Sequence, residues 1–305
     1  MLESERLDPL VVRKLRDPAV VVVPRPGRPP AAVICFIPGR WNNVRTWTRD
    51  DVGRDFRVGL AQRGFAVGAV PFRTSRLQMD LANLADCRTT DLLDDIDQAL
   101  LVTRRAFPEL PVILAGYSLG ASLACLAASR DAGLNGLILL DGGIAPSGSA
   151  QPLASRHDLV RSPSWNPRFR RQAEESLADS RNGWESVASP LITSLARDFD
   201  QLRYLMFGND EWWPSRQIEE IANLAESEAC GEILGGIRIP VLGVRSKDSS
   251  SGTRCAATIQ AMVESPSRTV HTLPADWTHI DVVSHPEVHA QWDQIAEWIE
   301  GVVLR

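Results

Sequence analysis

Residues 112–128 read VILAGYSLGASLACLAA, an apolar run followed by the pentapeptide GYSLG at 116–120 and then by small residues. The run from Val112 to Ala115 predicts a buried strand, and the small residues from Ala121 to Ala128 predict a helix. The pentapeptide fits the pattern G-x-S-x-G, in which a serine occupies a sharp turn between a strand and a helix. Glycines permit close packing around such a turn, and a helix N-terminus favours developing negative charge. Ser118 is therefore predicted to be a nucleophile, the alternative being a turn serine or a helix N-cap.

Short apolar runs alternate with segments of helical period along most of the chain, the pattern typical of βαβ units and a parallel sheet. We expect strands at 19–23, 32–37, 66–72, 112–115, 137–140, 241–245 and 268–273. Amphipathic helices are expected over 90–107, with Thr90 as the N-cap, and over 288–302. The predicted fold class is α/β, with a mostly parallel central sheet flanked by helices.

One long segment interrupts this alternation. Between Ile144 and Gly235 the sequence has no clear strand and is rich in Arg, Glu, Ala and Trp, and its beginning, 145–152, has the composition of turns. We therefore predict a core formed by 1–144 and 236–305, with a helical cap or lid inserted at 145–235.

A serine nucleophile requires a base and a carboxylate that orients this base, and the chain has five histidines. His279 follows the last expected strand by a short polar loop, where α/β sheets place functional groups, and it is preferred to His285. Two carboxylates lie just past the ends of expected strands. Asp248, in a Ser/Gly-rich loop beyond the sixth expected strand, is the first choice for the acid, and Asp141, beyond the fifth, is the alternative.

The succession of strand, GYSLG, helix, Asp248 and His279 resembles that of the α/β-hydrolase fold superfamily, over nearly the whole chain. The resemblance is to serine esterases or thioesterases with a helical cap. It implies that Ser118 is the nucleophile, Asp248 the orienting acid and His279 the general base. It also implies that no cofactor is needed.

The family's oxyanion hole uses the amide that follows the nucleophile, here that of Leu119, and a second amide from the loop after an early strand. This loop reads FIPGRW at 36–41, with Pro38-Gly39 where many members carry His-Gly. The resemblance therefore implies that Arg40 or Trp41 supplies the second N–H.

Aromatic residues suggest where a substrate binds, because small-molecule sites are mostly apolar and aromatic. The chain has nine tryptophans but only two tyrosines. The candidates for an apolar substrate pocket are Trp41, Tyr117, Trp184, Trp212 and Trp213. The alternative is that the tryptophans of the insertion form its own core.

Composition excludes several other classes. The formal net charge of −5 and the pI of about 5.6 argue against nucleic acid and an anionic membrane surface as partners. The longest apolar run, 31–37, is too short to span a bilayer, and residues 1–6 lack a secretory signal pattern, so a cytoplasmic location is expected. The expected partner is a small-molecule substrate. The five cysteines include no C-x-x-C pair and are expected to be reduced and buried. HPEVH at 285–289 departs from H-E-x-x-H, so no metal is expected, and the oligomeric state is left open.

These features together predict an enzyme: a serine hydrolase that cleaves a carboxylic ester or thioester of a small, largely apolar substrate through an acyl-enzyme on Ser118. An acyl transferase, a peptidase or a lactonase is the alternative within the same chemistry, since another nucleophile can resolve the same intermediate. A lyase-like enzyme on this fold and a non-catalytic binding module for small molecules are also compatible with the sequence.

Overall fold

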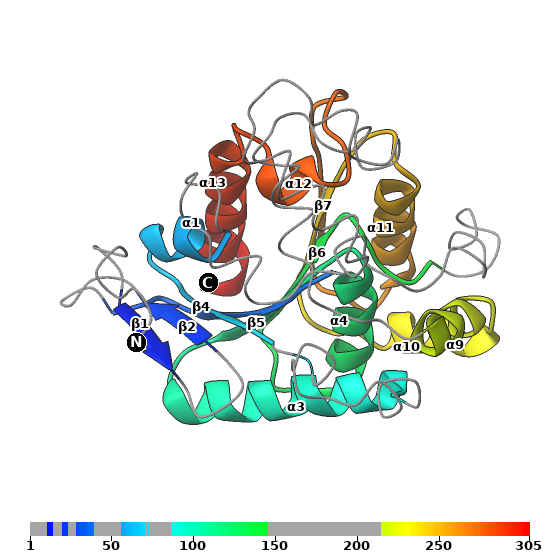
Figure 1. The fold of residues 1–305 in the computed structure, drawn as a ribbon, viewed down its shortest axis with the longest axis horizontal. Helices are drawn as coiled ribbons and strands as arrows, with labels where there is room; N and C mark the ends of the chain where they lie inside the picture. The colour runs from blue at the N-terminus through cyan, green and yellow to red at the C-terminus, as the bar shows by residue number, and fades with distance from the viewer. Residues whose placement is uncertain are drawn as a thin grey trace, which may run out of the picture.

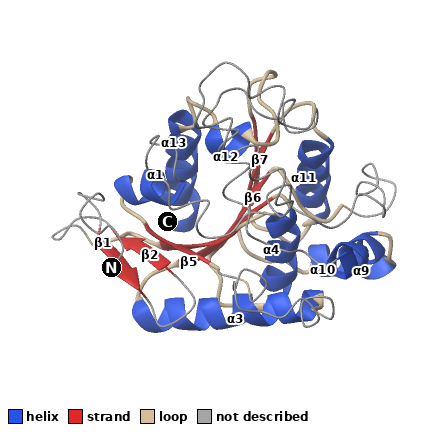
Figure 2. Cartoon of the chain, viewed as in Figure 1, coloured by secondary structure: helices blue, strands red, loops and turns tan. Residues whose placement is uncertain are grey.

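The structure, a computed structural model, describes residues 11–14, 20–23, 29–39, 56–70, 72, 87–145 and 215–305. In these parts of the chain a single sheet lies between two layers of helices (Figure 1, Figure 2). None of the helices in these ranges is long and apolar enough to cross a membrane.

The sheet has eight strands in the order β1-β2-β4-β3-β5-β6-β7-β8. They are β1 (Val11–Lys14), β2 (Val20–Val23), β3 (Val33–Ile37), β4 (Ala66–Ala69), β5 (Val112–Tyr117), β6 (Gly136–Leu140), β7 (Val241–Arg245) and β8 (Arg268–Thr272). The pairs β1–β2 and β2–β4 are antiparallel, and all the other neighbouring strands are parallel. The predicted α/β class with a mostly parallel sheet is confirmed.

The helices cover both faces of this sheet. They are α1 (Phe56–Gln62), α3 (Thr89–Ala106), α4 (Leu119–Arg130), α9 (Ser215–Ala225), α10 (Glu228–Gly235), α11 (Ser250–Ala261), α12 (Asp281–Ser284) and α13 (His289–Trp298), which a π-helical turn, η5 (Ile299–Val303), continues. Helices α1, α12 and α13 lie on one face of the sheet, and α3, α4 and α11 lie on the other (Figure 1). Side chains of α1, α12 and α13 contribute to one core, and those of α3, α4, α9, α10 and α11 to the other.

The central strands are buried because their side chains point alternately into the two cores, one on each face of the sheet. Along β5, Val112 and Leu114 belong to the core on the α4 side, whereas Ile113, Ala115 and Tyr117 belong to the core on the α13 side. Strands of this kind have continuous apolar sequences, which is why they were predictable. The strand at the end of the sheet, β8, instead alternates between exposed and partly buried residues.

The seven expected strands are all present, with small differences in their limits. Strand β4 ends at Ala69 rather than at residue 72, and β5 continues through Gly116 to Tyr117. Strand β1 was not predicted, because it has four residues, VVRK, two of which are charged. The last predicted helix, 288–302, corresponds to α13 together with η5.

The predicted N-cap of α3 was wrong. The helix begins at Thr89, and Thr90 lies in its first turn. The N–H of Arg88, the residue before the helix, donates to the carboxylate of Asp91 (2.7 Å), and the N–H of Thr89 donates to that of Glu220 on α9 (2.8 Å). Two carboxylates therefore satisfy N–H groups at this helix end, and Glu220 ties α9 to the core.

The predicted insertion, 145–235, lies mainly outside the described residues, which resume at Ser215. Its described end consists of α9 and α10, both of which contact the core of the α4 side through Ile221, Cys230 and Leu234. Its role as a cap stays a prediction.

The five cysteines are buried, and no disulfide joins them, as expected. Burial raises the pKa of Cys35 and of Cys255 to about 12. Since the thiolate is the reactive form of cysteine, these thiols serve as small apolar core residues.

The close packing of α4 on β5 gives a first prediction, on stability. A Cβ added to Gly116 would lie 2.6 Å from the carbonyl carbon of Gly120 and 2.7 Å from Cα of Ala121, so backbone would have to shift. We expect Gly116→Ala to lower the free energy of unfolding by about 1–3 kcal/mol, measured by chemical denaturation. Gly231→Ala is the control, because nothing lies within 4 Å of its added Cβ and alanine favours the helix. Equal loss of stability in both variants would contradict this account.

Candidate active site

Ser118 occupies the sharp turn between β5 and α4. Its backbone has φ of 55° and ψ of −119°, in a region that residues other than glycine rarely adopt. Its N–H donates to the carbonyl oxygen of Leu140 on β6 at 2.9 Å, which ties the strained turn to the sheet. The turn also packs closely on the loop after β3, since a Cβ at Gly120 would lie 2.9 Å from the carbonyl carbon of Pro38. The serine predicted to be the nucleophile is therefore held in a strained conformation at the carboxyl end of the sheet.

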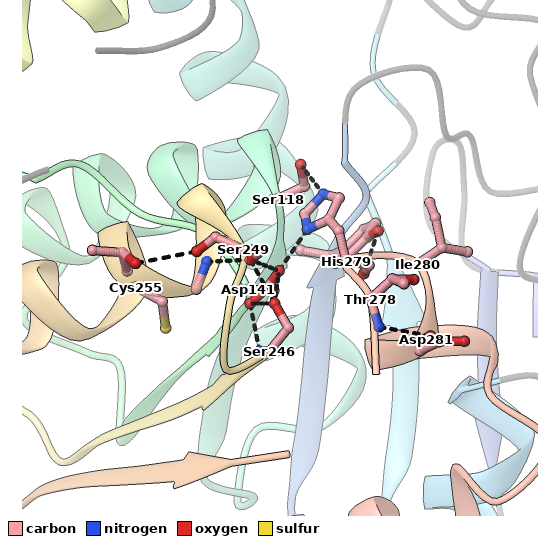
Figure 3. Close-up of polar contacts among 12 residues, drawn as sticks. Ser118, Asp141, Ser246, Ser249, Cys255, Thr278, His279, Ile280 and Asp281 are labelled. Atoms are coloured by element: carbon pink, nitrogen blue, oxygen red, sulfur yellow. Dashed lines mark hydrogen bonds and ion pairs between the residues drawn. The ribbon is translucent and has the colours of Figure 1, made fainter. Parts of the chain in front are cut away.

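His279 lies in the loop between β8 and α12 and faces Ser118. Its Nε2 is 2.9 Å from Oγ of Ser118 (Figure 3). The side chain of His279 is 23% exposed, so the protein does not cover the imidazole completely. The arrangement allows the serine hydroxyl to donate its proton to Nε2.

Asp141 lies directly after β6 and faces the other nitrogen of His279. Its Oδ2 is 2.7 Å from Nδ1 of His279, and the residue has no exposed surface. Asp141 has φ of 46°, and its N–H donates to the carbonyl oxygen of Val244 on β7 at 2.8 Å. With Nδ1 protonated toward the carboxylate, Nε2 keeps the lone pair that accepts from Ser118. The three side chains form one chain of hydrogen bonds in the order Ser118, His279, Asp141.

Two serines that were not predicted complete the surroundings of this carboxylate. The N–H of Ser246 donates to Oδ1 of Asp141 at 2.7 Å, and the Ser246 hydroxyl lies 2.9 Å from both carboxylate oxygens. The hydroxyl of Ser249 lies 3.0 Å from Oδ2, and it also accepts the N–H of Gly252 as the N-cap of α11 (Figure 3). A buried carboxylate needs such donors, because an unsatisfied charge is costly to bury. The available sequence signal was the position of Ser246, immediately beyond a buried strand at the same sheet edge.

The prediction that Asp248 is the acid was wrong, because Asp248 does not lie beside His279. Asp248 is exposed in the loop between β7 and α11. The buried place at the end of β7 belongs to Ser246, which donates to Asp141 rather than supplying a carboxylate. The carboxylate against His279 is therefore that of Asp141, the alternative.

His285, the alternative base, has other contacts. Its ring stacks on that of Trp277 with centroids 3.9 Å apart, and its Nδ1 accepts the N–H of Glu287 at 3.0 Å. The geometry therefore favours His279, the first choice.

Tyr117, one of the predicted pocket residues, is 1% exposed and offers almost no surface to a substrate. Its ring stacks on the imidazole of His279, with centroids 5.0 Å apart and an angle of 22° between the planes. Its hydroxyl donates to the main-chain carbonyl of His279 at 3.0 Å. The prediction that Tyr117 lines a pocket is corrected: the side chain lies beneath the histidine.

One of the predicted oxyanion donors belongs to the described part of the chain. Leu119 is the first residue of α4, so its N–H has no acceptor within the helix and lies at the positive end of the helix dipole. Arg40 and Trp41 lie outside the described residues, as do Trp184, Trp212 and Trp213. Gly39, directly before Arg40, lies against the turn: a Cβ there would be 3.0 Å from Cβ of Ser118. The chain after β3 thus passes beside the serine.

In the ranges that the structure describes, no group of three or more His, Cys, Asp or Glu side chains could hold a metal ion. The hydrogen-bonded side chains suit proton transfer between the serine, the imidazole and a third group.

Residues 33–292 match the model of the alpha/beta hydrolase family, and the chain belongs to this family. The match extends from β3 into α13 and includes Ser118, Asp141 and His279. The predicted family and the hydrolase class are thereby confirmed. No curated protein matches the chain in sequence.

Several solved structures are similar to this chain over nearly its whole length. A highly thermostable carboxyl esterase from Bacillus coagulans shares 16% identity at a TM-score of 0.66, covering 96% of this chain and 98% of its own. Monoglyceride lipase from Saccharomyces cerevisiae shares 12% at 0.63, covering 95% and 96%. MenH from S. aureus shares 14% at 0.56, covering 89% and 94%. At these identities the likeness concerns the fold.

The two candidate acids give a second prediction, measured as the rate at which a fluorophosphonate labels Ser118. Asp141→Asn replaces the carboxylate with an amide that can donate to Nδ1 of His279, which moves the imidazole proton to Nε2. We expect the labelling rate to fall by about 10³–10⁴-fold. Asp248→Asn is the matched control and should label at the wild-type rate. The opposite result, with Asp248→Asn impaired and Asp141→Asn unaffected, would refute the assignment of Asp141.

Proposed function

We propose that this protein is a serine hydrolase that cleaves a carboxylic ester or thioester of a small, largely apolar substrate. The observation that carries the proposal is the hydrogen-bonded chain in which Ser118 Oγ lies 2.9 Å from Nε2 of His279 and Nδ1 lies 2.7 Å from Asp141. A serine hydroxyl is a weak nucleophile by itself, and this arrangement supplies the base that it needs.

In the proposed first half-reaction, Oγ of Ser118 attacks the carbonyl carbon of the substrate while its proton passes to Nε2 of His279. Asp141 remains ionised and stabilises the imidazolium that forms. The tetrahedral intermediate then collapses, and the imidazolium gives its proton to the departing alcohol or thiol. The product of this half-reaction is an ester between the acyl group and Ser118.

In the second half-reaction, water attacks the acyl-enzyme and gives a proton to Nε2 of His279. Collapse of the second tetrahedral intermediate releases the carboxylic acid and returns the proton to Oγ of Ser118. The base, the nucleophile and the acid are restored, and one water is consumed for each ester or thioester cleaved.

We assign the stabilisation of the oxyanion to the N–H of Leu119 and to an N–H of Arg40 or Trp41, which follow Gly39 in the chain. A preorganised donor of this kind contributes about 3 kcal/mol to the transition state. The position of Leu119 at the start of α4, and of Gly39 beside Ser118, supports this assignment.

The substrate class is supported by the family and by the fold. Two similar structures are named a carboxyl esterase and a monoglyceride lipase. We propose that the insertion 145–235 caps the site and that its tryptophans, with Trp41, line an apolar acyl pocket.

The direct test is the intact mass of the protein after exposure to a small fluorophosphonate. We expect one adduct on the wild type and none on Ser118→Ala. Ser129→Ala is the matched control, because this exposed serine lies at the far end of the same helix, and it should be labelled like the wild type.

Turnover of p-nitrophenyl esters and matching thioesters of graded chain length then tests the substrate class. We expect Ser118→Ala to lower kcat by about 10⁶-fold. An added alcohol or amine separates hydrolysis from acyl transfer, because a transferase gives the new ester or amide. A folded wild type that forms no adduct and cleaves no substrate would contradict the proposal and favour the binding module.

A further inference from the structure

Tyr117 links the nucleophile turn to the loop that carries the base. It is the last residue of β5, directly before Ser118, and its side chain lies in the core on the α13 side of the sheet. The His279 loop reaches the same place from β8, which is three strands away across the sheet. Contacts between Tyr117 and His279 therefore join two segments that are distant in both sequence and sheet order.

Both parts of the Tyr117 side chain contact His279. The ring stacks on the imidazole at a centroid distance of 5.0 Å, which fixes the plane of the base. The hydroxyl donates to the main-chain carbonyl at 3.0 Å, which fixes the backbone that carries it. Because Tyr117 directly precedes Ser118 in the chain, both contacts fix the position of the imidazole relative to the nucleophile.

The hydroxyl of Tyr117 remains a donor under all ordinary conditions. Burial, together with the negative charges of Asp141 and Asp281, holds the pKa of Tyr117 well above its usual value. A buried phenol usually has a hydrogen-bond partner, and the described partner here is the carbonyl oxygen of His279.

The other side of the His279 loop is fixed by a buried acid. The carboxylate of Asp281, which has no exposed surface, accepts the N–H of Thr278 at 2.6 Å (Figure 3). Residues 274–276 of the loop are exposed, whereas Trp277 and Ile280, on either side of Thr278 and His279, are buried. Two hydrogen bonds therefore hold the main chain at His279: the N–H of Thr278 donates to Asp281, and the carbonyl oxygen of His279 accepts from Tyr117.

We propose that Tyr117 is a positioning residue for His279, with its hydroxyl fixing the main chain of the loop and its ring fixing the imidazole. This inference rests on the proposed function, in which His279 is the base. It assigns to Tyr117 a place behind the base rather than in the substrate pocket. The ring face also favours the imidazolium that forms when His279 takes the proton of Ser118, because a cation is attracted to an aromatic face.

Two substitutions separate the hydroxyl from the ring. Tyr117→Phe keeps the ring and removes the donor, and we expect kcat for a short-chain p-nitrophenyl ester to fall about 5- to 10-fold. Tyr117→Leu removes both contacts, and we expect a fall of about 100-fold. KM should remain at the wild-type value in both variants, since Tyr117 has almost no surface for a substrate.

Phe65→Leu is the matched control for loss of a buried ring. Phe65 belongs to the same core and has no exposed surface, but it lies directly before β4, at the amino end of the parallel strands, whereas Ser118 lies at their carboxyl end. It should lose stability as Tyr117→Leu does and keep the wild-type kcat. A rise in KM with kcat unchanged in Tyr117→Phe would overturn the proposal and restore Tyr117 to the pocket.

A spectroscopic measurement makes the test independent of turnover. The Nδ1 proton between His279 and Asp141 should give a far-downfield proton resonance, assigned by its loss in Asp141→Asn. We expect this resonance to shift or broaden in Tyr117→Phe and to be unchanged in Phe65→Leu. An unchanged resonance in Tyr117→Phe would overturn the proposal. This outcome does not depend on whether Tyr117→Leu folds. The two proposals can also fail separately. If the wild type is neither labelled nor active, but the resonance still changes in Tyr117→Phe, the serine hydrolase is contradicted and the positioning role of Tyr117 is not.

Discussion

The buried carboxylate of Asp141 organises the carboxyl edge of the sheet. It has no exposed surface and contacts Ser246, Ser249 and His279, which come from the end of β7, the start of α11 and the loop after β8. These contacts span separations of 105 residues for Ser246 and 138 for His279. Since a buried charge is unfavourable without enough donors, each of these segments is held in the position that satisfies it. The same contacts leave Nε2 of His279 directed at Ser118.

Parallel pairing explains why the nucleophile and the acid lie at neighbouring strand ends. Tyr117 pairs with Leu140, and Leu140 pairs with Val244. One residue beyond these pairs, Ser118 and Asp141 both take positive φ values while still donating their N–H groups to the neighbouring strand. The hydrogen-bond ladder therefore ends at the same level on both strands, and the chain turns there. Adjacent strands thus present the serine and the carboxylate side by side, while β7 contributes the hydroxyl and the N–H of Ser246.

Much of this arrangement was predictable from sequence, and the exceptions have physical reasons. The buried strands, Ser118 and His279 follow from local patterns, because apolar runs, the GYSLG turn and a polar loop beyond a strand are each visible in a few residues. Asp141 and Asp248 give almost the same local signal, a carboxylate after an apolar strand in a Gly- or Ser-rich turn. What separates them is burial and the donors around Asp141, which depend on contacts across the sheet. The role of Tyr117 was hidden for the same reason, since its partner lies 162 residues further along the chain.

A crystal structure of the protein after reaction with a small fluorophosphonate tests the central claim most directly. The account predicts a phosphonyl group on Oγ of Ser118, with a phosphonyl oxygen beside the N–H of Leu119. It also predicts that Nδ1 of His279 still contacts the carboxylate of Asp141, with Asp248 remaining at the surface. Modification of a different side chain, or a contact between His279 and Asp248 in place of Asp141, would contradict it.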